Sequence, residues 1–222
     1  LGVDINGEAA NDYSGQSVSL SSDGNTVAIG AFGNNGDKSD SSGHVKVFNY
    51  NGKLWYQLGS DIDGEAFGDN FGHSVSLSSD GNIVAVGAYG NDGNGTDSGR
   101  VRVYGYNATS WTQIGVDIDG ESDLDQSGYS VSLSSDGTIV AIGARINKAS
   151  GNNAGHIRVY NYNGSIWNQL GEDMDAEVAS GNYGDQLGWS VSLSSDGKTV
   201  AGGAPLNDGN GVDSGHVRVY NY

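Results

Sequence analysis

Apolar and polar residues alternate in short stretches along this chain. In the segment Ser17–Ser21, Val18 and Leu20 alternate with serines, a period of two that predicts a half-buried β-strand. Asp23-Gly24 follows and favours a tight hairpin turn, because type I′ turns need residues with positive φ. No segment shows helical periodicity, and further strands are predicted over Thr26–Ala31, over His44–Tyr50 and around Trp55.

This pattern is repeated along the whole chain. The string SVSLSSDG occurs four times, beginning at Ser17, Ser74, Ser130 and Ser190. The repeat units cover residues 1–57, 58–113, 114–169 and 170–222, and the last unit is cut short before its Trp-bearing strand. Units this similar are expected to be one supersecondary element used four times. Four antiparallel strands at this spacing predict an all-β propeller, with one blade per unit in a single domain.

Two short motifs carry a resemblance to a known family. Phe71-Gly72 begins the first strand of unit two, and Gly203-Ala204-Pro205 ends the second strand of unit four. With these motifs the chain resembles the FG-GAP repeats of integrin α-chain propellers, and more closely those of secreted microbial and algal proteins. The resemblance covers the whole chain and implies a β-propeller, in a family that serves adhesion, lectins and a few enzymes. Integrin-type repeats carry a calcium loop between strands one and two, whereas this chain has only the short connection Ser21–Gly24.

The number of blades in the complete ring stays open. Unit four lacks its outer strand, and residues before the first repeat supply at most a stub of one. Either the four blades close on themselves, or further repeats or another chain complete a larger ring. The chain begins at Leu1 without an initiator methionine or a signal-like segment, so we expect it to derive from a longer product.

Composition excludes several classes of function. The 222 residues contain no cysteine, which excludes disulfides, thiolate metal sites and a thiol nucleophile. No apolar run is long enough to cross a bilayer, so membrane insertion is not expected. The net charge of −17 would repel phosphate backbones, so nucleic acid is not an expected partner. Cations and basic partners are favoured.

Most of the acidic residues are expected at one end of the blades, in the loops before strand one and after strand two. In one interpretation they are a solvated surface that keeps the protein soluble. In the other they bind a hard cation, because carboxylates at i, i+2 and i+4 can converge on one ion within a tight loop. Calcium is then the candidate cofactor, and the candidate ligands are Asp61, Asp63, Glu65, Asp69, Asp117, Asp119 and Glu121.

Comparison of the four units separates scaffold positions from variable ones. Val18 and Leu20 have copies in every unit, which predicts a core role. The cations Lys46, Arg102, Arg158 and Arg218 also recur, and we interpret them as paired with a neighbouring blade's acid or extending toward solvent. Histidine recurs at the start of strand three as His44, His156 and His216, a repetition that favours a structural role over catalysis.

Two positions of the repeat carry a different residue in each unit. The residue before the first repeated serine is Gln16, His73, Tyr129 or Trp189, and the residue after Gly-Ala is Phe32, Tyr89 or Arg145 in the first three units. These side chains form a candidate ligand-binding rim, with aromatic rings suited to stacking on a sugar or a peptide. The alternative is neutral variation at an exposed edge.

Three functions therefore compete. The first is an extracellular, non-enzymatic binding or adhesion module, secreted or on a cell surface, whose ligand is a glycan or a protein. The acceptor-type triplets at Asn94, Asn107 and Asn163 agree with that location. The second is a structural repeat of a larger surface protein. The third is an enzyme acting on polysaccharide, against which stands the lack of any non-repeating catalytic cluster in the sequence.

Overall fold

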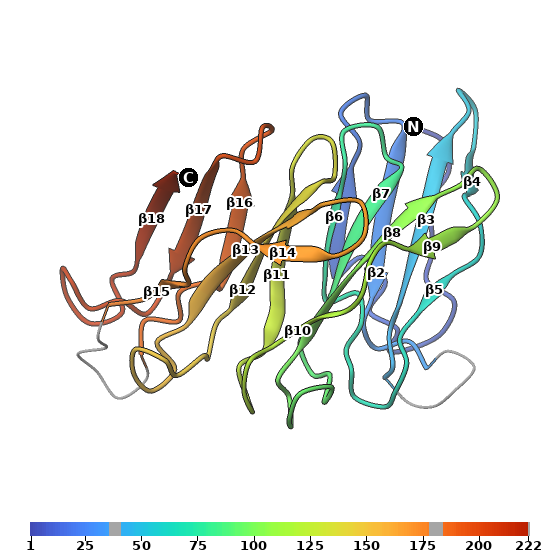
Figure 1. Cartoon of the computed structure of the whole chain (residues 1–222). Helices are drawn as coiled ribbons and strands as arrows, with labels where there is room; N and C mark the ends of the chain where they lie inside the picture. The colour runs from blue at the N-terminus through green and yellow to red at the C-terminus, as the bar shows by residue number, and fades with distance from the viewer. Residues whose placement is uncertain (36–40, 178–183, 222) are drawn as a thin grey trace.

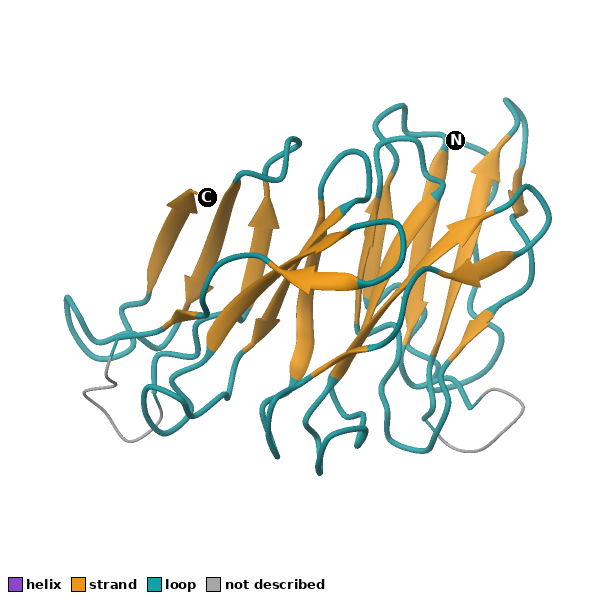
Figure 2. Cartoon of the chain, in the orientation of Figure 1, coloured by secondary structure: helices purple, strands orange, loops and turns teal. Residues whose placement is uncertain are grey.

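The chain folds into four antiparallel sheets that stand side by side in chain order (Figure 1). A computed structural model describes residues 1–35, 41–177 and 184–221. These residues contain strands and loops and no helix (Figure 2), and so none that could span a membrane. The prediction of an all-β propeller with one blade per repeat is confirmed.

Each of the first three blades has four strands and a short fifth one. The first sheet comprises β1 (Ser17–Leu20), β2 (Thr26–Ala31), β3 (His44–Tyr50), β4 (Trp55–Gln57) and β5 (Ile62–Asp63). The second comprises β6 (Ser74–Leu77), β7 (Ile83–Ala88), β8 (Arg100–Tyr106), β9 (Trp111–Gln113) and β10 (Ile118–Asp119). The third comprises β11 (Ser127–Leu133), β12 (Ile139–Ala144), β13 (His156–Tyr162), β14 (Trp167–Gln169) and β15 (Met174–Asp175).

The fourth sheet is smaller. Its described strands are β16 (Ser190–Leu193), β17 (Thr199–Ala204) and β18 (His216–Asn221). In the part of the chain that the structure describes, no strand pairs with the outer edge of β18. The N-terminal segment lies at the other end of the array, where the Leu1 carbonyl oxygen accepts a hydrogen bond from the indole of Trp55.

The outer strand of each complete blade is interrupted. β4 pairs with the last residues of β3, whereas β5 pairs with its first residues, with Asp63 opposite His44 and Ile62 opposite Val45. The short fifth strand therefore belongs to the sheet of the preceding repeat. This corrects the prediction that Asp61 and Asp63 lie in the loop that leads into strand one of the next blade.

The repeated serines join neighbouring blades. The Ser17 hydroxyl donates a hydrogen bond to the Gly72 carbonyl oxygen at 2.7 Å, and Ser19 Oγ accepts one from Leu77 N at 2.9 Å. Equivalent bonds recur at the next two interfaces. The inner strands β1, β6, β11 and β16 are thereby held next to one another in turn.

Glycine is required where these strands meet. A Cβ on Gly30 would lie 1.9 Å from the carbonyl oxygen of Gly72 in the next blade, and Gly72 itself has a φ of +87°. The same close approach recurs between Gly87 and Gly128 and between Gly143 and Gly188. The glycine before each variable rim position and the Gly-Ala motif of the preceding blade therefore mark a close backbone contact between blades.

The hydrophobic core consists of three layers, one between each pair of neighbouring blades. Val75 and Leu77 in β6 are buried against the first blade, as the repeat pattern predicts. The prediction of a core role is wrong for Val18 and Leu20, which are 64% and 60% exposed. They face the side of the first blade on which no described residues pack.

Candidate functional site

The variable positions of neighbouring blades meet in one continuous line of side chains. We call this set the aromatic row, and it consists of Tyr13, Phe32, His73, Tyr89, Tyr129, Arg145 and Trp189. Its members lie just before or at the start of each inner strand and just after each second strand. Because successive inner strands are neighbours, this placement brings one or two side chains per blade together.

Ring contacts link the row from the first blade to the last. The ring centroids of Phe32 and His73 lie 5.9 Å apart, and those of His73 and Tyr129 lie 4.7 Å apart. Tyr89 contacts both His73 at 4.7 Å and Tyr129 at 5.7 Å. Tyr129 in turn lies 5.2 Å from Trp189. Such tilted and edge-on arrangements are the favourable geometries for aromatic pairs.

Arg145 adds a positive charge to the row. Its guanidinium carbon lies 4.2 Å from the ring centroid of Tyr129 and 4.9 Å from that of Trp189. Arg145 Nε also donates a hydrogen bond to Gln126 Oε1 at 2.9 Å. This cation–π geometry holds the guanidinium between two aromatic rings.

The row is open to solvent on one side. Tyr13 and Trp189 are 59% and 41% exposed, and its other members are half-buried. Of the seven predicted rim residues, six belong to the row. Gln16 is exposed and makes no side-chain contact with the row among the described interactions.

Tyr13 is the member of the row that the sequence analysis missed. It stacks on Phe32 with a centroid distance of 5.1 Å and has a φ of +54°. The other three units place Asn70, Gln126 and Gln186 at this left-handed position. An aromatic residue at a position otherwise filled by Asn or Gln is the signal that could have identified it.

His73 lies inside the row, where burial lowers its pKa below the ordinary value of 6.5 and Arg145 adds to that shift. Its Nδ1 lies 3.2 Å from the Tyr129 carbonyl oxygen, a contact that acts in the opposite direction. His73 is therefore neutral at neutral pH, so that it contributes a ring rather than a charge.

The predicted calcium ligands lie at the acidic end, and several of them already have partners. Asp69 is buried, and its carboxylate accepts hydrogen bonds from the backbone N–H groups of Glu65 and Ala66 at 3.3 and 3.1 Å. Asp61 accepts a hydrogen bond from Gln57 at 2.6 Å. Asp69 thus closes its own loop in the manner of a capping residue.

The second blade fills the predicted site with arginine. Arg100 contacts Glu65 at 3.2 Å, Asp117 at 2.9 Å and Asp119 at 2.6 Å. Arg102 contacts Asp117 at 2.8 Å and Glu65 at 2.5 Å. Hydrogen bonds from Arg102 lower the pKa of Asp117 below its ordinary value, and burial acts in the opposite direction. Arg102 is thus paired with acids, but these are Glu65 of its own repeat and Asp117 beside β10 of its own sheet, rather than acids of a neighbouring blade as the sequence predicted.

The spacing i, i+2 and i+4 does not produce one ligand group. In the described residues, Asp61, Asp63 and Glu65 do not share a cluster, and neither do Asp117, Asp119 and Glu121. Along an extended strand, alternate residues share a face but are spread over several ångströms. Asp61 and Glu121 instead join side chains from other parts of the chain.

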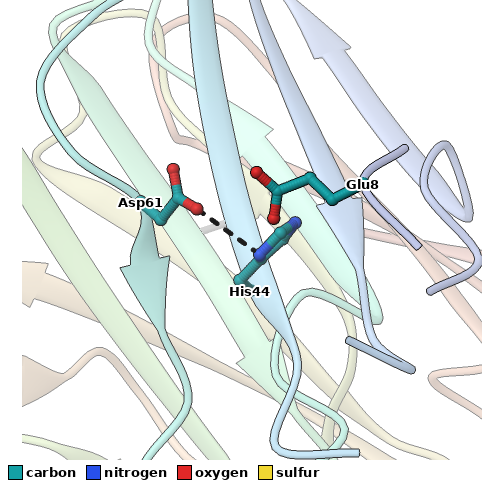
Figure 3. A group of neighbouring side chains, drawn as sticks. All are labelled: Glu8, His44 and Asp61. Carbon is teal, nitrogen blue, oxygen red and sulfur yellow. Dashed lines mark ion pairs between the residues drawn. The ribbon is translucent and has the colours of Figure 1, made fainter. Parts of the chain in front are cut away.

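Two groups of histidine and carboxylate side chains form at the acidic end. One consists of Glu8, His44 and Asp61 (Figure 3), and the other of Glu121, His156 and Asp173. In the first, His44 is buried and its Nδ1 lies 3.7 Å from Asp61 Oδ2. A polar cavity of about 320 Å³ lies beside this group, lined by residues that include Asp12, Asn34 and Asp63. Both groups recur at the same position of their repeats, beside the start of β3 and β13.

Comparison with known proteins finds a family match in the first two repeat units. Residues 6–48 and 61–104 each match the FG-GAP repeat family. Among solved structures, the hydrazine synthase of Kuenenia stuttgartiensis is similar, with a TM-score of 0.54 and 15% sequence identity. The match covers 99% of this chain and 49% of that chain, so this chain spans about half of its length and the likeness shows the fold alone. No curated protein sequence matches this chain.

Proposed function

We propose, from the premise that this chain is a β-propeller whose first two repeats match the FG-GAP repeat family, that it is an extracellular, non-enzymatic binding module whose ligand contacts the aromatic row. The observation that carries the proposal is the continuity of the row across four blades. Scaffold residues repeat in each unit, whereas the position before the first repeated serine holds a different side chain in each of the four units. Different side chains that touch one another along a single line are what selection for a particular ligand would produce.

A glycan fits the row better than a protein does. Aromatic rings offer flat apolar surfaces to the C–H faces of sugar rings, and Arg145 with Gln126 and Gln186 supplies hydrogen-bonding groups beside them. An extended peptide is the other ligand class that the row could take. Calcium assistance stays a prediction from the sequence.

A glycan array probed with and without calcium tests this proposal. Wild-type protein should bind a defined set of glycans. Trp189→Ala and Tyr129→Ala should each weaken that binding by about tenfold or more, which corresponds to about 1.4 kcal/mol. Tyr56→Ala is the matched control, because Tyr56 is a 46% exposed tyrosine on β4, outside the row. Equal binding by the row variants and by the control would contradict a site on the row.

A structural role in a larger assembly is the second candidate. Val18 and Leu20 on the first blade, and Val217 and Val219 on the last, are at least 60% exposed. These are the two faces that pack against each other at every internal interface, where the equivalent Val75 is 9% exposed. Further blades or another chain would cover them.

Sedimentation velocity distinguishes these roles. Concentration-dependent association that Leu20→Glu abolishes would favour assembly through the end faces. A monomer that binds glycans would favour the binding module alone. Product release from a polysaccharide would instead favour the enzyme hypothesis.

A further inference from the structure

We propose that Glu121, His156 and Asp173 in the third blade form a binding site for one divalent transition-metal cation. Their ligand atoms all lie within 4.8 Å of one another. His156 Nδ1 is 3.9 Å from Glu121 Oε2 and 3.8 Å from Asp173 Oδ2, and Asp175 Oδ1 lies at the same 3.8 Å. These distances are too long for hydrogen bonds. Metal bonds of about 2.0–2.2 Å allow one ion between such atoms to contact several of them after small side-chain movements.

His156 is the second observation that points to a ligand. Its side chain is 1% exposed, and neither ring nitrogen has a hydrogen-bond partner. A buried polar group without a partner costs about 1–3 kcal/mol. A cation at Nδ1 would use the lone pair that faces the three carboxylates, with the imidazole proton on Nε2.

The second blade has a cationic side chain at the equivalent position. Arg100 occupies the place of His156 there, and its guanidinium contacts Glu65, Asp117 and Asp119. The equivalent carboxylates in the third blade are Glu121, Asp173 and Asp175. Replacement of arginine by histidine removes one positive charge and leaves three carboxylates facing a neutral ring. A bound cation would restore the charge that Arg100 supplies.

The neighbouring arginine, Arg158, faces one of the two carboxylate oxygens of Glu121. Arg158 Nη1 lies 3.4 Å from Glu121 Oε1, so the other oxygen of this carboxylate faces His156. Gln169 donates a hydrogen bond to Asp173 Oδ1 at 2.6 Å and fixes the direction of Oδ2 toward the ring. Glu121 and Asp175 are each 41% exposed, which gives an ion access from solvent.

The first blade has a weaker version of this site. Lys46 contacts Glu8 directly and lies 3.5 Å from Asp61, so both carboxylates of that group already face an ammonium. In the third blade, Arg158 contacts Glu121, and its other described polar contact is with the backbone oxygen of Asp119. We therefore assign the tighter site to the third blade.

The donor set selects the class of ion. One imidazole nitrogen with two or three carboxylate oxygens suits Zn²⁺, Mn²⁺ or Fe²⁺, whereas Ca²⁺ prefers a shell of six to eight oxygens. Among these ions, Zn²⁺ is a suitable probe because it has no redox chemistry and tolerates low coordination numbers.

Titration calorimetry of the metal-free, 222-residue protein with Zn²⁺ tests the proposal. Wild type should bind about one Zn²⁺ more tightly than it binds Ca²⁺ or Mg²⁺. His156→Arg copies the residue of the second blade and should weaken the tight event by at least about tenfold. His44→Arg should retain it. His216→Arg changes the equivalent histidine of the fourth blade, beside which the described residues have no outer strand, and should also behave as wild type.

Asp173→Asn provides a second variant in case His156→Arg disturbs folding, since the amide keeps the shape of the carboxyl group. It should also weaken Zn²⁺ binding by about tenfold, with a melting temperature of the metal-free protein close to that of wild type. The visible spectrum of Co²⁺-loaded protein should change in His156→Arg and not in His216→Arg. Equal Zn²⁺ affinity in wild type and His156→Arg would overturn the proposal. So would retention of the tight event in His156→Arg together with its loss in His44→Arg, or Ca²⁺ binding as tight as Zn²⁺ binding.

Discussion

Gly87 in β7 and Gly128 in β11 belong to neighbouring blades, and a Cβ on Gly87 would lie 2.0 Å from the Gly128 carbonyl oxygen. No side chain rotation can relieve such a contact, because both partners are backbone. The separation of the inner strands therefore depends on glycine at this position.

Gly87→Ala should destabilise the protein by about 3 kcal/mol, the upper part of the range for overpacking. At roughly 2–4 °C per kcal/mol, the melting temperature should fall by about 6–12 °C in a thermal scan. Gly203→Ala is the matched control, since the nearest atom there is the hydroxyl of Ser190 and no following blade is described. Similar losses in both variants would contradict a clash between blades as the cause.

The repeated Ser-Ser-Asp-Gly turns predict that the stability of the protein depends on pH at low pH. Asp136 accepts hydrogen bonds from Ser134 Oγ at 2.7 Å and from Thr138 N at 3.0 Å, and these lower its pKa below the ordinary value of 3.8. A lowered pKa stabilises the fold at pH values above 3.8, and the contribution is lost as the pH falls through the folded-state pKa. Asp136→Asn should cost about 1 kcal/mol at pH 7 and less at pH 3.

Urea denaturation at pH 7 and at pH 3 measures this difference. Glu172→Gln removes a charge at another exposed position and serves as the control. Should both substitutions have the same effect at both pH values, the turn hydrogen bonds would not be the cause.

His73 predicts a second pH dependence, in a higher range. Because burial lowers its pKa below 6.5, the folded state resists protonation, and stability should decrease as the pH falls through 6.5 toward the folded-state pKa. His73→Tyr, which copies Tyr129 of the next blade, should remove this part of the decrease. As the pH is lowered from 7.5 to 5, the melting temperature of the variant should therefore increase relative to that of wild type. A constant difference would show that His73 does not titrate in that range.

Among the described residues no strand pairs with the outer edge of β18, which predicts that an added strand stabilises the protein. A C-terminal extension that copies residues 163–176 could pair with β18 as β14 and β15 pair with β13. Burial of its indole ring should contribute about 2 kcal/mol and raise the melting temperature by roughly 4–8 °C. A scrambled extension of the same composition is the control. An unchanged melting temperature with the copied extension would indicate that this edge is already covered.

The sequence predicts the blades well because their determinants are local. Alternation in Ser17–Leu20, the Asp23-Gly24 turn and the repeat period define three strands of each sheet. Most of the aromatic row could also be predicted from the sequence, because comparison of the units distinguishes variable residues such as His73 and Tyr129 from the invariant serines that follow them. Both inferences need only the order of residues within a unit.

Long-range pairing explains what the sequence could not predict. The order of strands in the repeat placed Asp61 and Asp63 in the loop before strand one, but pairing of Ile62 with Val45 places Asp63 in β5 and Asp61 directly before it, in the sheet of the previous blade. The grouping of Glu121 and His156 with Asp173 joins residues from two repeat units. Val18 is exposed because no described blade packs against its side of the first blade, and the pattern within one unit cannot predict this.

The hydrogen bond between Ser74 and Gly128 has an evolutionary consequence. It links two blades through a hydroxyl and a peptide carbonyl, and the residues beside these groups in the chain are His73 and Tyr129. The linking atoms do not depend on which side chains those neighbours carry. Duplication of a unit therefore adds a position to the aromatic row without requiring a new way to fold, and substitutions there can change the side chains of the row one blade at a time.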